Sequence, residues 1–283
     1  MNIIRKINYF KLESNYLRQL KKENLRMVVL TEHNWHKPDP HRNIAYNKTD
    51  PSQNSSNHPG VLFLGGLASD MEGTKAKFLE SLALELGFSY TRFDYTGHGK
   101  SSGEFSDGSI ASWLEDAFSI LDDLTYGKQI LVGSSMGGWI ALLLAKYKPH
   151  RVHSFIGIAA APDFTEDYMW KSFDKDQRSQ ILKEGFIYQE TDYSDEPYKI
   201  SKNLIFDSRK HLVLRDNLGL PFPVRLLQGT DDKDVPPDMA INLLNHLDSP
   251  DAKLEIVKGA DHSFSSEDCL NLLSQKIKEL LKT

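Results

Sequence analysis

The chain has 283 residues, of which 40% are hydrophobic and 26% are charged, so a large single core is possible and disorder or a fibrous architecture is not indicated. The net charge of −5 gives no basic surface for nucleic acid, and no apolar run approaches the ~20 residues needed to cross a bilayer. Cys269 is the one cysteine, which excludes an intrachain disulfide and a thiolate zinc site. It falls in the apolar rhythm of the last predicted helix, where a small core residue is expected.

The N-terminal segment is basic. Its first 26 residues carry seven Lys or Arg and two Glu, about +5, against about −10 for the remainder. No apolar region follows the basic start, so a secretory signal is not predicted, and a solvated amphipathic arm is favoured over a transit peptide. We therefore expect a cytoplasmic protein, with mitochondria as the alternative if this segment is a transit peptide.

Two short strands are predicted first, at MVVLTE from Met27 and IAYNK from Ile44, with a Pro- and His-rich turn between them. The histidines of that turn, His33, His36 and His41, are interpreted as surface residues rather than metal ligands because they lack an obvious carboxylate and cysteine partner set. We expect residues 1–40 to form an N-terminal extension with the first strand, and residues 41–283 to form the main domain.

From Val61 onwards, apolar runs of four to six residues alternate with stretches of helical period, which is typical of βαβ units in a parallel sheet. The predicted strands are VLFL from Val61, SYTRFD from Ser89, QILVGS from Gln129, HSFIGIA from His153, PVRLLQ from Pro223 and KLEIVK from Lys253. The predicted helices include 75–86, 110–124 and 267–281, the last capped by Ser265 or Ser266.

The alternation lapses between Pro162 and Leu220, a stretch too long for an ordinary connection. It is predicted to be a helical insertion, at about 162–220, that covers one edge of the sheet. The expected fold class is therefore α/β, with a mostly parallel eight-stranded sheet flanked by helices and carrying a small helical cap.

A G-x-S-x-G pattern lies between the predicted strand QILVGS and the apolar helix that follows it, in the residues Gly133-Ser134-Ser135-Met136-Gly137. Between a strand and a helix this pattern predicts a nucleophile elbow, a strained turn that holds Ser135 clear of the sheet. A serine hydroxyl is a poor nucleophile at neutral pH, so a base and an orienting acid must accompany it.

The base and acid are expected in loops after late strands. Of ten histidines, only His262 follows a C-terminal strand and precedes the closing helix, and His98 in a glycine-rich loop is the competitor. In the loop GTDDKDVPP, the spacing G-x-x-D-x-x-V-P selects Asp232 as the acid, with Asp234 as second choice and Asp231 as a turn residue.

Acyl transfer also needs hydrogen-bond donors for the oxyanion. The backbone N–H of Met136 is expected to supply one, and that of Leu67, in the loop GGLASDMEG, the other. A further loop, FDYTGHGKSSG, turns tightly at Gly97 and Gly99 beside the site, and its lone G-x-G is weak evidence for a nucleotide.

Taken together, LFLGGLASDMEGTKA, FDYTGHGKSSG, LVGSSMGGW, VRLLQGTDDKDVP and DHS resemble the α/β-hydrolases. The resemblance is to the subgroup of mycophenolic acid acyl-glucuronide esterase, mitochondrial palmitoyl-protein thioesterase and their bacterial relatives, and it runs from about Ile44 to the C-terminus. It implies a triad of Ser135, Asp232 and His262, and an oxyanion hole made by Leu67 and Met136.

The sequence thus predicts a serine hydrolase that cleaves carboxylic esters or thioesters, of small molecules or acylated proteins, through an acyl-enzyme. No cofactor, metal, nucleic acid or transmembrane segment is expected, and the chain is expected to be a monomer or a dimer. A serine peptidase or amidase with the same triad is an alternative, as is a non-catalytic hydrolase-like binding protein. Aromatic residues of the insertion are expected either to line an acyl pocket or to pack the insertion onto the body, namely Tyr168, Trp170, Phe173, Phe186 and Tyr188.

Overall fold

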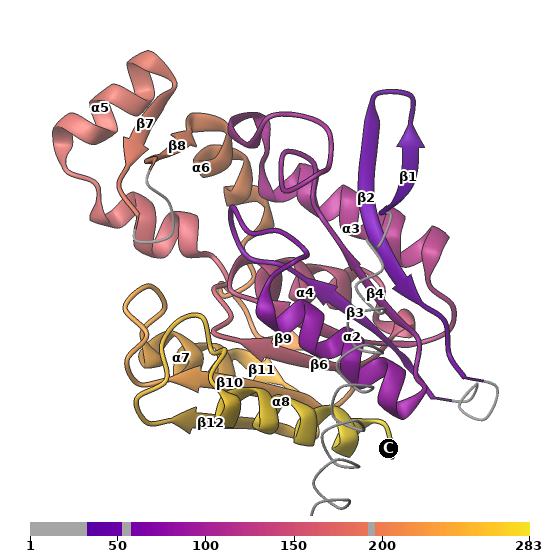
Figure 1. Cartoon of the computed structure of the whole chain (residues 1–283). Helices are drawn as coiled ribbons and strands as arrows, with labels where there is room; N and C mark the ends of the chain where they lie inside the picture. Colours follow the sequence, from indigo (N-terminus) through magenta and orange to yellow (C-terminus); the bar gives the residue numbers. More distant parts are fainter. Residues whose placement is uncertain (1–32, 53–57, 192–195) are drawn as a thin grey trace, which may run out of the picture. The chain divides into compact units, whose positions relative to one another are not determined.

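Eight strands form one sheet in the order β1-β2-β4-β3-β5-β6-β10-β12, drawn as a computed structural model in Figure 1. The structure describes residues 33–52, 58–191 and 196–283, and from Trp35 onwards they form one compact unit. β2 runs antiparallel to β4, while the pairs from β4 through β3, β5, β6 and β10 to β12 are parallel. The strands are β1 (Asn34–Asp39), β2 (Arg42–Thr49), β3 (Gly60–Leu64), β4 (Tyr90–Phe93), β5 (Gln129–Ser134), β6 (Val152–Ile158), β10 (Val224–Gly229) and β12 (Ala252–Val257).

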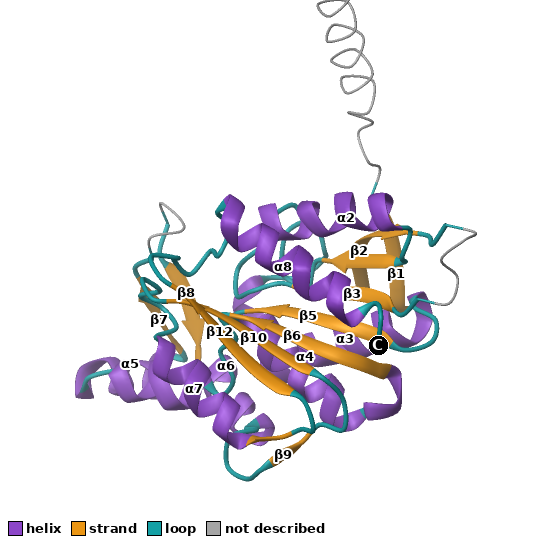
Figure 2. Cartoon of the chain, turned by 90° about the horizontal axis from the view of Figure 1, so that it is seen from below, coloured by secondary structure: helices purple, strands orange, loops and turns teal. Residues whose placement is uncertain are grey.

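Helices cover both faces of the sheet, because the strands bury both sets of alternating side chains. Leu62 and Leu64 of β3 join the core beneath one face, whereas Val61 and Phe63 join the core on the other. The first face is covered by α3 (Ile110–Leu124) and α4 (Met136–Tyr147), and the second by α2 (Thr74–Leu86) and α8 (Glu267–Leu280) (Figure 2). α7 (Pro237–His246) packs against β10 and β12.

The expected α/β class and mostly parallel eight-stranded sheet are confirmed. The helix predicted over 110–124 has those bounds, and α8 begins after Ser266, whose hydroxyl accepts a hydrogen bond from the Cys269 amide at 3.3 Å. Cys269 is buried, as expected of a core residue.

The prediction for the start of the sheet was wrong in one part. The Pro- and His-rich segment forms strand β1, and only Pro40 and His41 make the turn into β2. Pro38 is tolerated inside β1 because β1 is the edge strand, where a missing N–H breaks no ladder with a further strand. The strand predicted at Met27–Glu32 lies outside the described residues.

Between β6 and β10 the chain leaves the sheet and builds the insertion, residues 159–223 (Figure 1). It contains a π-helical turn η4 (Thr165–Trp170), α5 (Lys175–Glu184), α6 (Lys202–Ser208) and a 3-10 turn η5 (Arg209–His211). It also contains an antiparallel pair of strands that the sequence pattern did not predict, β7 (Phe186–Gln189) and β8 (Tyr198–Ser201), and the short strand β9 (Leu218–Gly219), which pairs with β11 (Leu247–Asp248).

The first and last parts of the insertion are joined through the carboxylate of Asp163. Asp163 is fully buried, and its two oxygens accept hydrogen bonds from the backbone amides of Val213 and Leu214, at 2.8 and 2.9 Å. Arg215 lies 3.6 Å from the same carboxylate. The start and end of the insertion are therefore joined where they meet the sheet.

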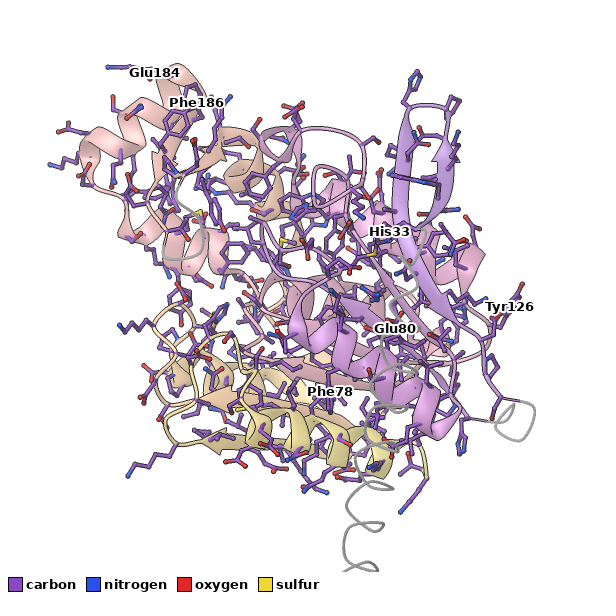
Figure 3. The ribbon with its side chains drawn as sticks, viewed as in Figure 1. His33, Phe78, Glu80, Tyr126, Glu184 and Phe186 are labelled. Atoms are coloured by element: carbon purple, nitrogen blue, oxygen red, sulfur yellow. The ribbon has the colours of Figure 1, made fainter. Side chains whose placement is uncertain are left out.

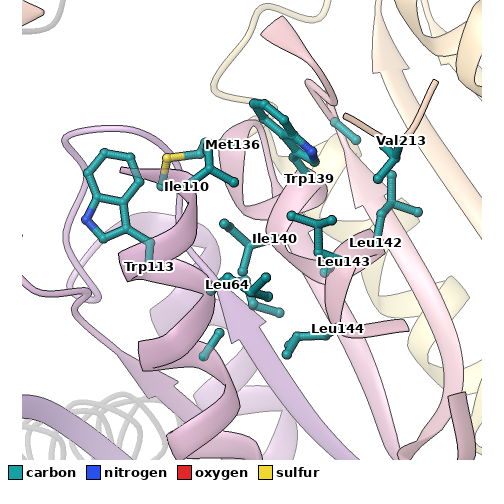
Figure 4. Close-up of a cluster of buried hydrophobic side chains, with 14 of the residues drawn as sticks. Leu64, Ile110, Trp113, Met136, Trp139, Ile140, Leu142, Leu143, Leu144 and Val213 are labelled. Atoms are coloured by element: carbon teal, nitrogen blue, oxygen red, sulfur yellow. The ribbon is translucent and has the colours of Figure 1, made fainter. Parts of the chain in front are cut away.

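Helix α4 is the most enclosed helix among the described residues, with ten of its 12 residues buried, and Figure 4 shows its side chains packed against β3 and α3. Trp139 adds a polar tie, because its indole N–H donates to the His211 carbonyl at 2.9 Å. No helix within the described ranges is long and apolar enough to span a membrane.

We expect Leu142→Ala, at a fully buried position of α4, to lower the free energy of unfolding by about 2–5 kcal/mol because it leaves a cavity. The control Leu84→Ala makes the same chemical change at a position that is 66% exposed and is expected to cost less than about 0.5 kcal/mol. Urea denaturation of both variants measures the difference. Equal losses would contradict the central place of α4 in the core.

Candidate active site

Ser135 sits in a strained turn between β5 and α4. Its backbone has φ 55° and ψ −122°, a conformation that L residues rarely adopt. The turn is held by hydrogen bonds from the Ser135 amide to the Ile158 carbonyl at 2.9 Å and from the Ala161 amide to the Ser135 carbonyl at 3.1 Å. The serine is half-buried and lines a pocket.

The glycines on either side of Ser135 allow three elements to meet. A Cβ on Gly137 would lie 2.1 Å from the Leu64 carbonyl oxygen at the end of β3. A Cβ on Gly133 would lie 2.5 Å from the Gly137 carbonyl oxygen. Any side chain at either position would push α4 away from the strands, so the spacing G-x-S-x-G is a packing requirement.

His262 and Asp232 form a hydrogen-bonded pair. Nδ1 of His262 lies 2.9 Å from Oδ2 and 3.1 Å from Oδ1 of Asp232. Since an ionised carboxylate only accepts hydrogen bonds, Nδ1 carries the proton and the lone pair of the neutral ring is on Nε2.

The Asp232 carboxylate is fully buried and its remaining positions are filled. Oδ1 accepts from the amides of Asp234 and Val235, at 3.0 and 2.8 Å, and Oδ2 accepts from the Gln228 side chain at 3.1 Å. These donors fix the carboxylate in the plane that faces His262. Asp231, by contrast, is exposed and accepts from the Thr230 hydroxyl, as expected of a turn residue.

Ser135 and His262 face the same pocket, of about 390 Å³. Its wall comes from the loop after β3, the start of α2, the elbow and the loop that carries His262, with Tyr198 from the insertion. The predicted residues Ser135, His262 and Leu67 therefore meet at the C-terminal edge of the sheet, although they are far apart in the sequence.

The two predicted oxyanion donors belong to segments next to Ser135, since Met136 follows it in the chain and Leu67 follows Gly66. A Cβ built on Gly66 would lie 3.4 Å from the Ser135 Cβ, so the backbone next to Leu67 runs directly beside the serine. Within the described part of the chain, the backbone N–H groups of Leu67 and Met136 donate to no protein acceptor, whereas those of Ala68 and Ser69 do. The arrangement leaves two amides available to a ligand atom.

Lys75, at the start of α2, is a pocket residue that sequence reasoning missed. Its ammonium group donates to the carbonyl of Ser263, the residue after His262. Burial lowers the pKa of Lys75 to about 8, although the charge of Asp261 opposes the shift. Lys75 thus ties α2 to the loop that presents His262.

His98, the competing histidine, lies elsewhere. It is 3% exposed, does not line the pocket, and its Nε2 accepts a hydrogen bond from the Ala68 amide at 3.1 Å. Burial lowers the pKa of His98 to about 4, so the ring is neutral at physiological pH. The structure therefore brings His262, and not His98, to the pocket of Ser135.

One set of three side chains in the described ranges has potential metal-ligand atoms within 4.8 Å of one another: Asp232, Asp234 and His262. Nδ1 of His262 faces Asp232, and both Asp232 oxygens already accept N–H groups, so the set fits a hydrogen-bonded pair better than a cation site. His33, His36 and His41 form no such set, and His36 lies 3.2 Å from the Asp123 carboxylate.

The aromatic residues of the insertion that are enclosed pack against one another and do not line the pocket. Phe173 is buried, and Trp170 contacts both Phe173 and Phe206 edge to face. Phe186 pairs with the exposed Tyr188 and lies beside Glu184 at the outer end of the insertion (Figure 3). None of the five predicted aromatics is on the described pocket wall, where Tyr198 is the aromatic residue from the insertion. No sequence signal distinguished Tyr198.

Comparison with known proteins supports the resemblance to the α/β-hydrolases that the sequence motifs indicate. Residues 59–201 match the family described as the alpha/beta hydrolase fold. Human mitochondrial palmitoyl-protein thioesterase ABHD10 is 32% identical over 240 residues, which is 84% of this chain and 76% of that protein. The mouse protein of the same name is 33% identical over 240 residues, 84% of this chain and 79% of its own length.

Solved structures show the same likeness in three dimensions. A protein of Agrobacterium vitis S4 described as a hydrolase has a TM-score of 0.84 and 37% identity, covering 88% of this chain and 98% of that chain. Mouse alpha/beta hydrolase domain-containing protein 10 has a TM-score of 0.80 and 31% identity, covering 89% of this chain and 99% of that one.

The burial of His98 predicts an acid-sensitive stability. The unfolded chain binds a proton at this residue below pH ~6.5, whereas the folded chain does so only near pH 4, so stability falls as the pH drops through this window. Between pH 7 and pH 5 we expect wild type to lose about 1–2 kcal/mol more than His98→Gln, which has no group to titrate there. Urea denaturation at the two pH values measures this difference, and parallel losses in both proteins would show that His98 titrates normally.

Proposed function

The chain belongs to the α/β-hydrolase family, and from this premise we propose that it is a serine hydrolase that cleaves carboxylic esters or thioesters through an acyl-enzyme. Ser135 is the nucleophile, His262 the general base and Asp232 the residue that orients the base. The observation that carries the proposal is the hydrogen bond between the buried Asp232 carboxylate and Nδ1 of His262. His262 lines the same pocket as Ser135, which is held in a strained turn.

In the first half of the reaction, His262 Nε2 removes the hydroxyl proton as Ser135 Oγ attacks the acyl carbon. The new C–O bond places a negative charge on the former carbonyl oxygen. His262 then returns the proton to the leaving alcohol or thiol as its bond to carbon breaks. Asp232 stabilises the imidazolium that exists between these two transfers.

The oxyanion is stabilised by the backbone N–H groups of Leu67 and Met136. Removing one donor of this kind lowers kcat by about 10²–10³-fold, because a preorganised donor stabilises the negative charge without having to reorient. Support comes from the two amides, which have no protein acceptor in the described part of the chain, and from the close approach of Gly66, the residue before Leu67, to Ser135.

In the second half, His262 removes a proton from water as the water oxygen attacks the acyl carbon of the ester with Ser135. The carbon–Oγ bond breaks, the proton returns to Ser135, and the carboxylic acid leaves. The scheme uses side chains, backbone amides and water only, so no cofactor is needed.

Thioesters of acylated proteins are the substrate class that the relatives favour, since ABHD10 is named as a palmitoyl-protein thioesterase. Small-molecule esters are the second class, because the same acyl-enzyme forms from either. A peptidase or amidase differs in its leaving group, an amine that must be protonated as it departs. Turnover of an acyl ester without turnover of the matching amide distinguishes esterase from amidase, and failure of both would favour a non-catalytic binding protein.

For cellular location, the names of the mammalian relatives favour mitochondria over the cytoplasm. The basic composition of the first 26 residues agrees with a transit peptide. Fusing residues 1–33 to a fluorescent protein tests this proposal, and a diffuse cytoplasmic signal would reject it.

We expect Ser135→Ala to lower kcat for p-nitrophenyl acyl esters by about 10⁴-fold or more, because no other group can form the acyl-enzyme. A fluorophosphonate probe, which bonds to an activated serine and releases fluoride, should label wild type and leave the variant unlabelled. As a control, Ser134→Ala changes the neighbouring serine and should retain labelling. Undiminished turnover by Ser135→Ala would reject the assignment.

The acid is tested by two matched substitutions in one loop. Asp232→Asn removes the charge that faces His262 and is expected to lower kcat by about 10³–10⁴-fold. Asp234→Asn removes a charge that lies close to the same pair but on an exposed residue, and it keeps the backbone amide that donates to Asp232. We expect it to change kcat by less than about tenfold. Steady-state kinetics on one ester measures both, and a larger loss for Asp234→Asn would exchange the two assignments.

A further inference from the structure

Building on the proposed function, we propose that His98 is a positioning residue for acyl transfer. Its Nε2 holds the backbone amide of Ala68 and thereby sets the neighbouring amide of Leu67 toward the oxyanion. This gives the loop FDYTGHGKSSG, which follows β4 and takes no part in the triad, a role in the reaction.

The contact is a single hydrogen bond at a strained place. The Ala68 amide donates to Nε2 of His98 at 3.1 Å, and Ala68 has a φ of 54°. An alanine in this left-handed region costs free energy and persists only where its surroundings hold it. The Ala68 N–H belongs to the same rigid peptide unit as the Leu67 carbonyl, so anchoring it fixes the direction in which the backbone of Leu67 turns.

The histidine ring is itself held in place. Tyr95, Phe105 and Trp113 meet it edge to face, with ring centroids 5.6, 5.4 and 5.0 Å away. Nδ1 faces the Thr96 carbonyl at 3.4 Å, so this nitrogen carries the proton and Nε2 presents its lone pair to Ala68. The Trp113 indole N–H donates to the same Thr96 carbonyl at 3.0 Å, which fixes that side of the enclosure.

Neighbouring residues of β4 and its loop hold the same segment at a second point. Oδ1 of Asp94 accepts from the Met71 amide at 2.6 Å, and the Arg92 guanidinium donates to the Met71 carbonyl and to Glu72. Arg92 also reaches Glu80 on α2, at 3.0 Å, which Figure 3 labels. Since this second point is independent of His98, loss of the His98 contact should loosen the turn at Leu67 and Ala68 without releasing the whole loop.

The role differs from that of a buried packing residue. Packing needs only the shape of the ring, whereas positioning needs an acceptor at the place of Nε2. Three substitutions separate these requirements. His98→Phe keeps an aromatic ring and removes the acceptor, His98→Gln keeps an amide oxygen near the position of Nε2, and His98→Asn keeps an amide that reaches only the position of Nδ1.

The experiment compares these variants with wild type on one p-nitrophenyl acyl ester at pH 7.5. We expect His98→Phe and His98→Asn to lower kcat by about 10–100-fold with KM changed by less than about threefold, because an oxyanion donor acts mainly in the transition state. His98→Gln should recover at least half of the lost activity on a logarithmic scale. An alkyl trifluoromethyl ketone, whose adduct with Ser135 carries an oxyanion, should bind more weakly by the same factor as kcat/KM falls, whereas binding of the matching amide should not change.

The outcomes distinguish a failure of the proposed function from a failure of the role assigned to His98. Wild type that shows no Ser135-dependent turnover would reject the proposed function itself. If wild type is active, equal kcat and equal ketone affinity in His98→Phe would overturn the role of His98 alone. Equal losses in the Gln and Asn variants would also overturn it, because the position of the acceptor would then be irrelevant. If His98→Phe does not fold, the Gln and Asn pair carries the same test.

Discussion

The approach of α4 to the end of β3 is the constraint on which the site depends. The amino end of the helix comes so close to the strand that a single methyl group at Gly137 would overlap the Leu64 carbonyl oxygen. The chain passes from β5 into α4 through a turn at Ser135 with a φ of 55°, a backbone conformation that costs free energy. The buried surface of α4, including Leu142 and Trp139, stabilises the strained turn.

The remaining parts of the site are positioned relative to this turn by loops at the same edge of the sheet. Asp232 follows β10 and His262 follows β12, two strands that pair in parallel and so deliver both loops to one place. Gln228 shows how closely the loop after β10 is specified, because its one side-chain amide group donates to Asp232, Gly229 and Val235. Lys75 performs a similar task from the other side, through its bond to the Ser263 carbonyl.

Sequence reasoning reached the parallel sheet and the pair of His262 and Asp232 because each depends on local rules. Strand period, helix period and the position of a loop after a strand are all visible in a window of a few residues. The first strand was missed for the same reason. Pro38 and the histidines around it indicate a turn locally, and only the edge position, which is set by distant strands, makes β1 possible.

Contacts between separate loops were also beyond a reading of the sequence alone. The sequence indicates His98 only as a competing base, since nothing in FDYTGHGKSSG shows that its ring reaches an amide thirty residues earlier in the chain. Tyr198 could not be distinguished from the other aromatics of the insertion, because which of them faces the pocket depends on how β8 pairs with β7.

The hydrogen bonds of Asp163 affect how the insertion can change during evolution. Its carboxylate accepts hydrogen bonds from amides fifty residues further along the chain, so the two ends of the segment between them lie close together. Segments that begin and end at the same place can be lengthened, shortened or exchanged with little effect on the strands beneath, because closing a longer loop adds only a small entropic cost. A lineage that kept this aspartate could therefore vary the segment that brings Tyr198 to the pocket wall, while Ser135, Asp232 and His262 stay on loops of the sheet.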